Sequence, residues 1–260
     1  IFHTIAGSIL SFFLHLIFHE IGHLLGGLLT GWSFLYLQLF NLALVKENKT
    51  ISFRIVSSCN FQCIMSPASL YSNPYVYIFG GCFINLLLTI VGLTVVLAGG
   101  RNIVAFIYGW SLFVMGAGFL VMNGVPRVRR ICNDMACYRM LVNDKLTRLC
   151  HNLQLIAARL LFKGASYRQL GEGLLALPSD YAYNDILAYQ ALLEYYFYLD
   201  MNDYESMKRA LGKIKDERNL SHLIKSYYKI ELIYISLIDK IKSPQLWGLS
   251  KSYYKRLLKK

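Results

Sequence analysis

The chain has 260 residues, of which 55% are hydrophobic and only 16% are charged, and its formal net charge is +12. Soluble globular domains carry about 25% charged residues, so this composition argues against an ordinary soluble protein. It also excludes an intrinsically disordered chain, because disordered chains are poor in the aromatic residues that make up 14% of this one.

The charge divides the chain near residue 123. Residues 1–122 hold four of the 27 Lys and Arg residues and two of the 15 Asp and Glu residues, and all the others follow. The sequence therefore predicts an apolar N-terminal part joined to a basic C-terminal part.

Three segments of the apolar part are long enough to cross a membrane as helices. They comprise residues 3–29, 76–98 and 103–122, and the last two contain no charged side chain. About 20 apolar residues span the hydrocarbon core of a bilayer. We therefore predict a polytopic membrane core of three helices. Core helices of a large soluble protein are the alternative, and a removable signal peptide fits the first segment poorly because that segment is long and rich in histidine.

Basic residues beside the spans indicate their orientation. The loop between the second and third spans carries only Arg101. The other flanking charges lie after the third span or between the first two, at Lys46, Lys49, Arg54, Arg127, Arg129, Arg130 and Arg139. By the positive-inside rule, residues 30–75 and 123–260 are expected in the cytoplasm of a multi-pass protein, with a bacterial plasma membrane as the expected setting.

The excess of basic residues is explained by their attraction to anionic lipid at the cytoplasmic surface. No nucleic-acid partner is expected.

The loop between the first two spans is predicted to form a short β-hairpin. Residues 34–44 are apolar with little helical periodicity, residues 46–49 are suited to a turn, and residues 51–55 alternate as a strand does. An amphipathic loop at the membrane surface is the alternative.

The C-terminal part has a helical pattern. Apolar residues recur at helical spacing over residues 146–161, and residues 187–198 and 204–214 form an expected helical hairpin with a polar turn at 200–203. Two further helices are predicted over 221–241 and 246–258. The fold class is thus mainly α, with a membrane core over residues 1–141 and a soluble cytoplasmic helical domain over 142–260. Binding a cytoplasmic protein partner is the natural role for that domain.

The first predicted span contains a metal-binding motif, His19-Glu20-Ile21-Gly22-His23. Residues i and i+4 lie on one face of a helix, so both imidazoles can reach one metal ion. Glu20 lies beside them, where it can accept a proton from the attacking water. Ionisable residues inside a span are functional by default, although histidines that hydrogen-bond within a helix bundle are the alternative.

His15 lies one turn before the motif and is a further candidate ligand. It is eight residues from His23, about 12 Å along a helix, whereas zinc–nitrogen bonds are about 2.1 Å long. We expect His15 to hydrogen-bond within the bundle or to contact one of the residues that bind the metal, without binding the metal itself. The six cysteines are expected to be reduced and to serve as small apolar side chains, with metal binding by Cys59 and Cys63 or by Cys132 and Cys137 as the alternative.

Three motifs together resemble the site-2 protease family of intramembrane zinc metalloproteases. The first is residues 19–23. The second, Gly80-Gly81-Cys82-Phe83-Ile84-Asn85, is similar to that family's glycine-rich patch ending in Asn. The third runs from Asn123-Gly124-Val125-Pro126 to Asn133-Asp134-Met135, where the family usually has Asn, Pro and then Asp-Gly. The resemblance covers about residues 1–141.

This resemblance implies a zinc ion held by His19, His23 and Asp134, with Glu20 as the general base. It also implies that Asn85 and Asn123 orient the substrate. Met135 departs from the usual Gly, and the alternative for Asp134 is the beginning of an amphipathic helix that Asn133 or Asp134 itself caps.

The predicted function is that of an intramembrane zinc metalloendopeptidase. Such an enzyme cleaves membrane-anchored proteins or peptides near the cytoplasmic face of the lipid bilayer. The first alternative is an inactive, binding-type membrane protein of the same fold that serves in peptide export or immunity. A metal transporter is a second alternative. Glu20 favours the enzyme, because a binding protein does not need a general base.

Overall fold

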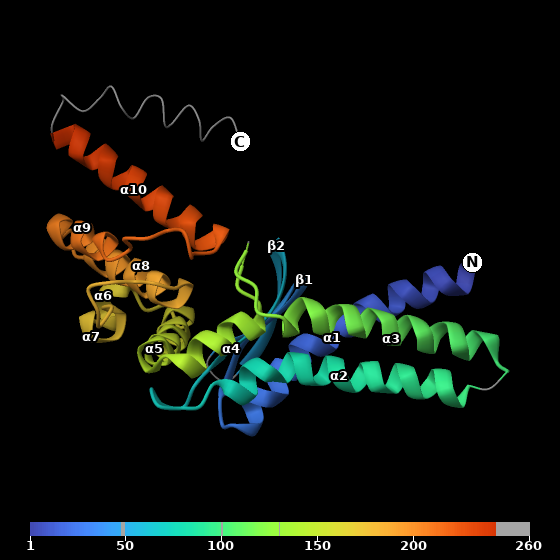
Figure 1. The fold of residues 1–260 in the computed structure, drawn as a ribbon. Helices are drawn as coiled ribbons and strands as arrows, with labels where there is room; N and C mark the ends of the chain where they lie inside the picture. Colours follow the sequence, from blue (N-terminus) through green and yellow to red (C-terminus); the bar gives the residue numbers. More distant parts are fainter. Residues whose placement is uncertain (48–49, 100, 130, 243–260) are drawn as a thin grey trace. The chain divides into compact units, whose positions relative to one another are not determined.

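The computed structural model describes residues 1–47, 50–99, 101–129 and 131–242 (Figure 1). This described part is mainly helical and contains one two-stranded antiparallel sheet. It divides into two compact units. Among the described residues, the first consists of residues 1–128 and 132–166, and the second consists of residues 129, 131 and 167–242.

Three long helices form the main body of the first unit, and they confirm the three predicted apolar segments. α1 (Phe2–Leu29), α2 (Tyr75–Ala98) and α3 (Ile103–Gly124) are each long and apolar enough to cross a membrane. They pack against one another in all three pairs (Figure 1). Most polar side chains in the middle of these helices are buried and many of their large apolar side chains are exposed, which is the pattern expected of helices in lipid.

Glycines allow α1 and α2 to approach closely. A Cβ atom placed on Gly22 would lie 2.3 Å from the carbonyl oxygen of Gly80, and a Cβ on Gly80 would lie 2.2 Å from the carbonyl oxygen of Gly22. No larger residue fits at either position unless the helices separate. This contact lies within the His-Glu-x-x-His motif, so it fixes the distance between that motif and α2.

The predicted hairpin is confirmed, and its strands are longer than expected. β1 (Ser33–Glu47) pairs with β2 (Thr50–Ser66) from Ser33 opposite Ser66 to Glu47 opposite Thr50. The predicted turn at residues 48–49 lies outside the described residues. Much of β2 is exposed and polar, which explains why apolar alternation identified only its first part.

The helices that follow α3 belong to the first unit. α4 (Asp134–Asn143) and α5 (Lys145–Phe162) pack on α2 and on the sheet, respectively. The buried amide of Asn152 donates hydrogen bonds to the backbone carbonyls of Leu70 (2.8 Å) and Ser72 (2.9 Å). These contacts belong to the first compact unit, which runs to residue 166. The predicted domain boundary at residue 141 stays a prediction.

The second unit is an array of helices. The predicted hairpin is confirmed as α8 (Asp185–Asp200) and α9 (Tyr204–Gly212), and Asp203 caps α9 by accepting a hydrogen bond from the backbone N–H of Ser206. The other helices are α6 (Tyr167–Leu170), α7 (Glu172–Leu175) and α10 (His222–Lys242). The helix predicted over residues 246–258 lies outside the described residues.

A buried ion pair lies inside this second unit. The Lys213 ammonium is 2.8 Å from the Glu194 carboxylate, and the same carboxylate accepts a hydrogen bond from the backbone N–H of Leu177. These contacts satisfy two charges that would be costly to bury alone. They also hold the segment before α8 against the chain that follows α9.

The close approach of α1 and α2 predicts a position-specific effect of adding one methyl group. Gly80→Ala should lower the free energy of unfolding by about 1–3 kcal/mol, because the added Cβ overlaps the backbone of α1. Gly118→Ala is the matched control, since a Cβ at Gly118 on α3 meets no atom within 4 Å. Thermal unfolding of both variants in detergent measures the difference. Equal stability of the two variants would contradict the tight crossing.

Candidate metal centre

The motif residues of α1 lie on its inward face. His19, Glu20 and His23 are all buried, with 8%, 6% and 8% of their surfaces exposed. Both imidazoles face α2 at Gly81, where an added Cβ would lie 2.6 Å from each ring. Gly81 therefore provides the space that the two rings occupy.

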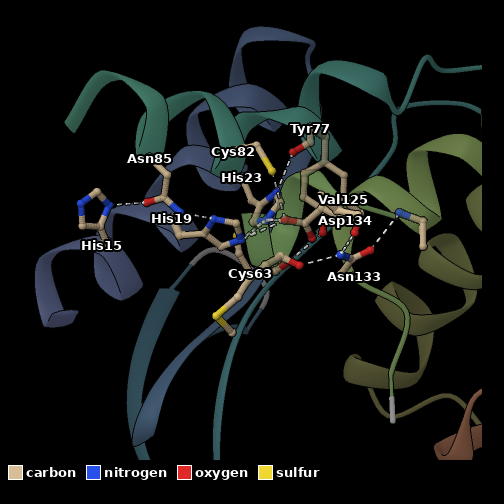
Figure 2. A network of polar contacts seen from close by, with 12 residues as sticks. His15, His19, His23, Cys63, Tyr77, Cys82, Asn85, Val125, Asn133 and Asp134 are labelled. Carbon is tan, nitrogen blue, oxygen red and sulfur yellow. Dashed lines mark hydrogen bonds and ion pairs between the residues drawn. The ribbon is translucent and has the colours of Figure 1, made fainter. Parts of the chain in front are cut away.

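Asp134 completes a group of three potential ligands. Its Oδ2 atom lies 2.9 Å from Nε2 of His19 and 3.5 Å from Nε2 of His23 (Figure 2). The two Nε2 atoms are 3.2 Å apart. The sequence thus correctly grouped these three residues, although Asp134 is more than 100 positions away along the chain.

The spacing of these donor atoms fits a tetrahedral zinc site. Zinc lies about 2.0–2.1 Å from its nitrogen and oxygen ligands, so tetrahedral ligands are about 3.3 Å from one another. The three observed separations of 2.9, 3.2 and 3.5 Å bracket that value. Two imidazoles and one carboxylate, with a fourth position left for water or substrate, are also the ligand set typical of catalytic zinc.

The backbone of α2 orients the His23 ring. The Nδ1–H group of His23 donates a hydrogen bond of 2.8 Å to the carbonyl oxygen of Tyr77, which leaves Nε2 as the atom that faces Asp134. Tyr77 in turn donates from its hydroxyl to the carbonyl oxygen of Cys63 on β2, over 2.6 Å. Because outer hydrogen bonds of this kind set the tautomer of a ligating histidine, Tyr77 would support metal binding by His23 without itself being a ligand.

Asn133 positions Asp134. The Asn133 side chain caps α4 by accepting a hydrogen bond from the backbone N–H of Ala136. Its amide group also donates to the carbonyl oxygens of Met122 and Val125 at the end of α3, over 2.7 Å each. The beginning of α4 is therefore fastened to the end of α3 (Figure 2). Asp134 is the first residue of that helix, so helix initiation and ligand geometry are compatible at this position.

The Asp134 carboxylate has the ionisation state that a ligand needs. Burial opposes its ionisation, but the contacts with the His19 and His23 imidazoles outweigh this effect and hold the pKa of Asp134 well below its usual range. An anionic carboxylate at neutral pH is the form that binds a divalent cation.

Glu20 shares one pocket with the three potential ligands. The pocket has a volume of about 250 Å³, and Phe61, Gln62 and Cys63 of β2 form one of its walls. It therefore offers space for water and for part of an extended peptide beside the Glu20 carboxylate.

The two asparagines suggested as substrate-binding residues lie elsewhere. Asn85 is completely buried on α2 and contacts His15 and His19 through its side chain. Asn123 is partly buried in the last turn of α3. The residues that line the pocket, among those described, include neither of them. Their role toward a substrate remains a prediction, whereas the expected hydrogen bonding of His15 within the bundle is confirmed.

Other residues also line this pocket, among them three of the cysteines that were the alternative metal ligands. His151 of α5 lines it, and burial lowers the pKa of His151 to about 4, so the ring is neutral at physiological pH. Cys63, Cys132 and Cys137 also line the pocket, and all six cysteines of the chain are free thiols. No pattern in the sequence connected His151 to the motif, because only the packing of α5 brings it there.

Comparison of the chain with family models, with curated proteins and with solved structures finds no match. The function of the site is therefore inferred only from its own residues and their geometry.

This geometry predicts how metal content responds to substitution. The purified protein should bind about one zinc ion per chain, and His19→Ala, His23→Ala and Asp134→Ala should each abolish binding at micromolar zinc, because two ligands hold the ion too weakly. Metal analysis after gel filtration measures this content. His3→Ala, which removes an exposed histidine from the same helix, should have no effect. Unchanged zinc content in Asp134→Ala would mean that the third ligand is another residue.

Proposed function

We propose that the chain is an intramembrane zinc metalloendopeptidase of the kind that it resembles, the site-2 proteases. The observation that carries the proposal is the meeting of His19, His23 and Asp134 with the Glu20 carboxylate around one pocket. Glu20 makes this a candidate catalytic site rather than only a metal site. The helix that bears the motif has the length and composition of a membrane span.

The proposed reaction is hydrolysis of a peptide bond. Zinc held by the three ligands would polarise the scissile carbonyl and make water nucleophilic at neutral pH. A carboxylate oxygen of Glu20 accepts one proton from the attacking water and delivers it to the nitrogen of the leaving amine. Hydroxide thus adds to the carbonyl carbon, the C–N bond breaks, and Glu20 returns to its anionic form.

An extended substrate fits this site better than a helical one. Amides within a helix are already hydrogen-bonded, so a substrate helix must unwind before its carbonyl reaches the ligands. β2 lines the pocket through residues 61–63, and its neighbour in the described sheet is β1 alone. The proposed role of β2 is to hold the unwound segment by adding it as a further strand.

The proposed enzyme cuts near the cytoplasmic face of the bilayer. His19 precedes the end of α1 by ten residues, or about 15 Å of helix. The basic residues after α3 and in the hairpin favour a cytoplasmic position for that end of α1. The second unit would then lie in the cytoplasm, where it could bind a protein partner.

A binding-type membrane protein for peptide export or immunity is the second candidate. The pocket and its β2 wall would serve such a protein equally well. A buried carboxylate that faces the metal ligands is costly to retain, however, and it has no use in a protein that only binds.

Removing the general base tests the reaction directly. Glu20→Gln should lower cleavage of a single-span model substrate in detergent by about 10²–10⁴-fold, because the amide cannot accept the proton of water. Its zinc content should stay at the wild-type level, since Glu20 is not one of the three ligands. Glu205→Gln, at an exposed position on α9, is the matched control and should cleave normally. Undiminished cleavage by Glu20→Gln would rule out this mechanism.

The proposed orientation predicts the location of inserted reporters. A reporter fused after Lys260 should be active only as a cytoplasmic protein, and one inserted after Arg101 should be active only outside the cytoplasm. Paired fusions to alkaline phosphatase and to a fluorescent protein distinguish the two sides. Alkaline phosphatase activity after Lys260 would reverse the orientation.

A further inference from the structure

A row of polar side chains leads away from the metal centre into the helix bundle. The Asn85 amide lies between two imidazoles, with its Oδ1 atom 3.1 Å from Nδ1 of His15 and its Nδ2 atom 3.0 Å from Nδ1 of His19 (Figure 2). His15 and Asn85 are completely buried. Each contact joins α1 to α2, and His15 lies one helical turn before His19 on α1.

The far end of this row is anchored to α3. The Nε2–H group of His15 donates a hydrogen bond to the backbone carbonyl of Leu112, over 3.1 Å. The His15 ring stacks on Phe119 and fills space that only glycine leaves at position 116, where an added Cβ would lie 2.7 Å from the ring. A carbonyl oxygen can only accept, so it determines that the proton of a neutral His15 ring is on Nε2.

That proton position determines which way the Asn85 amide should point. With Nε2 protonated, Nδ1 of a neutral His15 is an acceptor, and it needs the NH₂ group of Asn85 as its donor. If Oδ1 faces His15 instead, both ring nitrogens must donate, and His15 must carry a charge at a completely buried position, which is costly. A half-turn of the amide exchanges its oxygen and nitrogen at almost no change in shape.

The same half-turn gives His19 the tautomer that a metal ligand needs. With Oδ1 toward His19, the Nδ1–H group of His19 donates to Asn85. When a metal ion replaces the 2.9 Å contact between Nε2 of His19 and Oδ2 of Asp134, Nε2 can then direct a free electron pair at the ion. With Nδ2 toward His19, the ring proton must be on Nε2, where it points at Asp134 and blocks metal binding. Neutral rings and metal binding therefore require the same orientation of Asn85.

We propose that His15 and Asn85 form a positioning relay that holds His19 in its metal-binding tautomer. The carbonyl of Leu112 fixes the proton of His15, His15 fixes the amide of Asn85, and Asn85 fixes the proton of His19. His23 needs no such relay, because it donates directly to the carbonyl of Tyr77. The inference rests on the metal-binding part of the proposed function and is independent of the proteolytic part.

The zinc dissociation constant of the full chain in detergent, measured by competition with a chelator, tests the relay. Asn85→Leu removes the acceptor for His19 and should weaken zinc binding by about 10–100-fold. His15→Leu leaves the amide unoriented and should weaken binding by about tenfold. His3→Leu, which changes an exposed histidine on the same helix, should leave binding unchanged.

A rescue experiment separates orientation from packing. A carboxylate accepts through either oxygen, so an aspartate at position 85 can accept from His19 without a second residue to orient it once His15 is removed. Combining His15→Leu with Asn85→Asp should restore the affinity that His15→Leu loses alone. The thermal midpoint of each metal-free variant shows whether the fold is kept.

Two results would overturn the relay. One is wild-type zinc affinity in Asn85→Leu. The other is a double variant that binds zinc no better than His15→Leu, because His15 would then act through its packing on α3. Failure of the wild-type protein to bind zinc would remove the metal centre together with the relay. Normal zinc binding and a positive relay test without peptide cleavage would contradict only the proteolytic function.

Discussion

The contact between the backbones of α1 and α2 at Gly22 and Gly80 is the constraint on which the metal centre depends. It brings the His-Glu-x-x-His motif so close to α2 that the two imidazoles fit only against Gly81. At this distance the carbonyl of Tyr77 reaches His23, and the amide of Asn85 reaches His19. We expect the hydrogen bonds of His23 to Tyr77 and of His19 to Asn85 to break if an added methyl group pushes the two helices apart. The glycine-rich patch thus determines ligand orientation as well as helix packing.

The bundle has most of its polar groups inside and many of its large apolar side chains outside. Buried histidine and glutamate side chains are costly in an apolar surrounding unless a partner compensates them. Hydrogen bonds to backbone carbonyls compensate part of this cost at His15 and His23. A divalent cation between His19, His23 and Asp134 would offset more of the cost of burial. Each of the three side chains would then bind the cation instead of only contacting another ligand atom.

Local patterns in the sequence were sufficient for the longer described helices, the hairpin and the motif residues, but not for α4, α6 and α7. The i, i+4 spacing of His19 and His23 is a property of one helix, so it needed no tertiary information. Asp134 was found through the resemblance, but the reason that it reaches the site is the cap and cross-link made by Asn133, which is a tertiary feature. His151 and the unit boundary at residue 166 could not be predicted, because both result from the packing of α5. The contacts of Asn85 could not be predicted either, since an Asn on an apolar helix does not reveal its neighbours.

X-ray absorption at the zinc edge of the purified, zinc-loaded protein tests the central claim most directly. The pocket contains three thiols as well as the three proposed ligands, and sulfur and nitrogen ligands have different bond lengths. The account predicts a first shell of nitrogen and oxygen atoms alone, at about 2.0–2.1 Å, with the scattering pattern of two imidazoles. A sulfur shell at about 2.3 Å would contradict it, because cysteine would then hold the metal in place of Asp134.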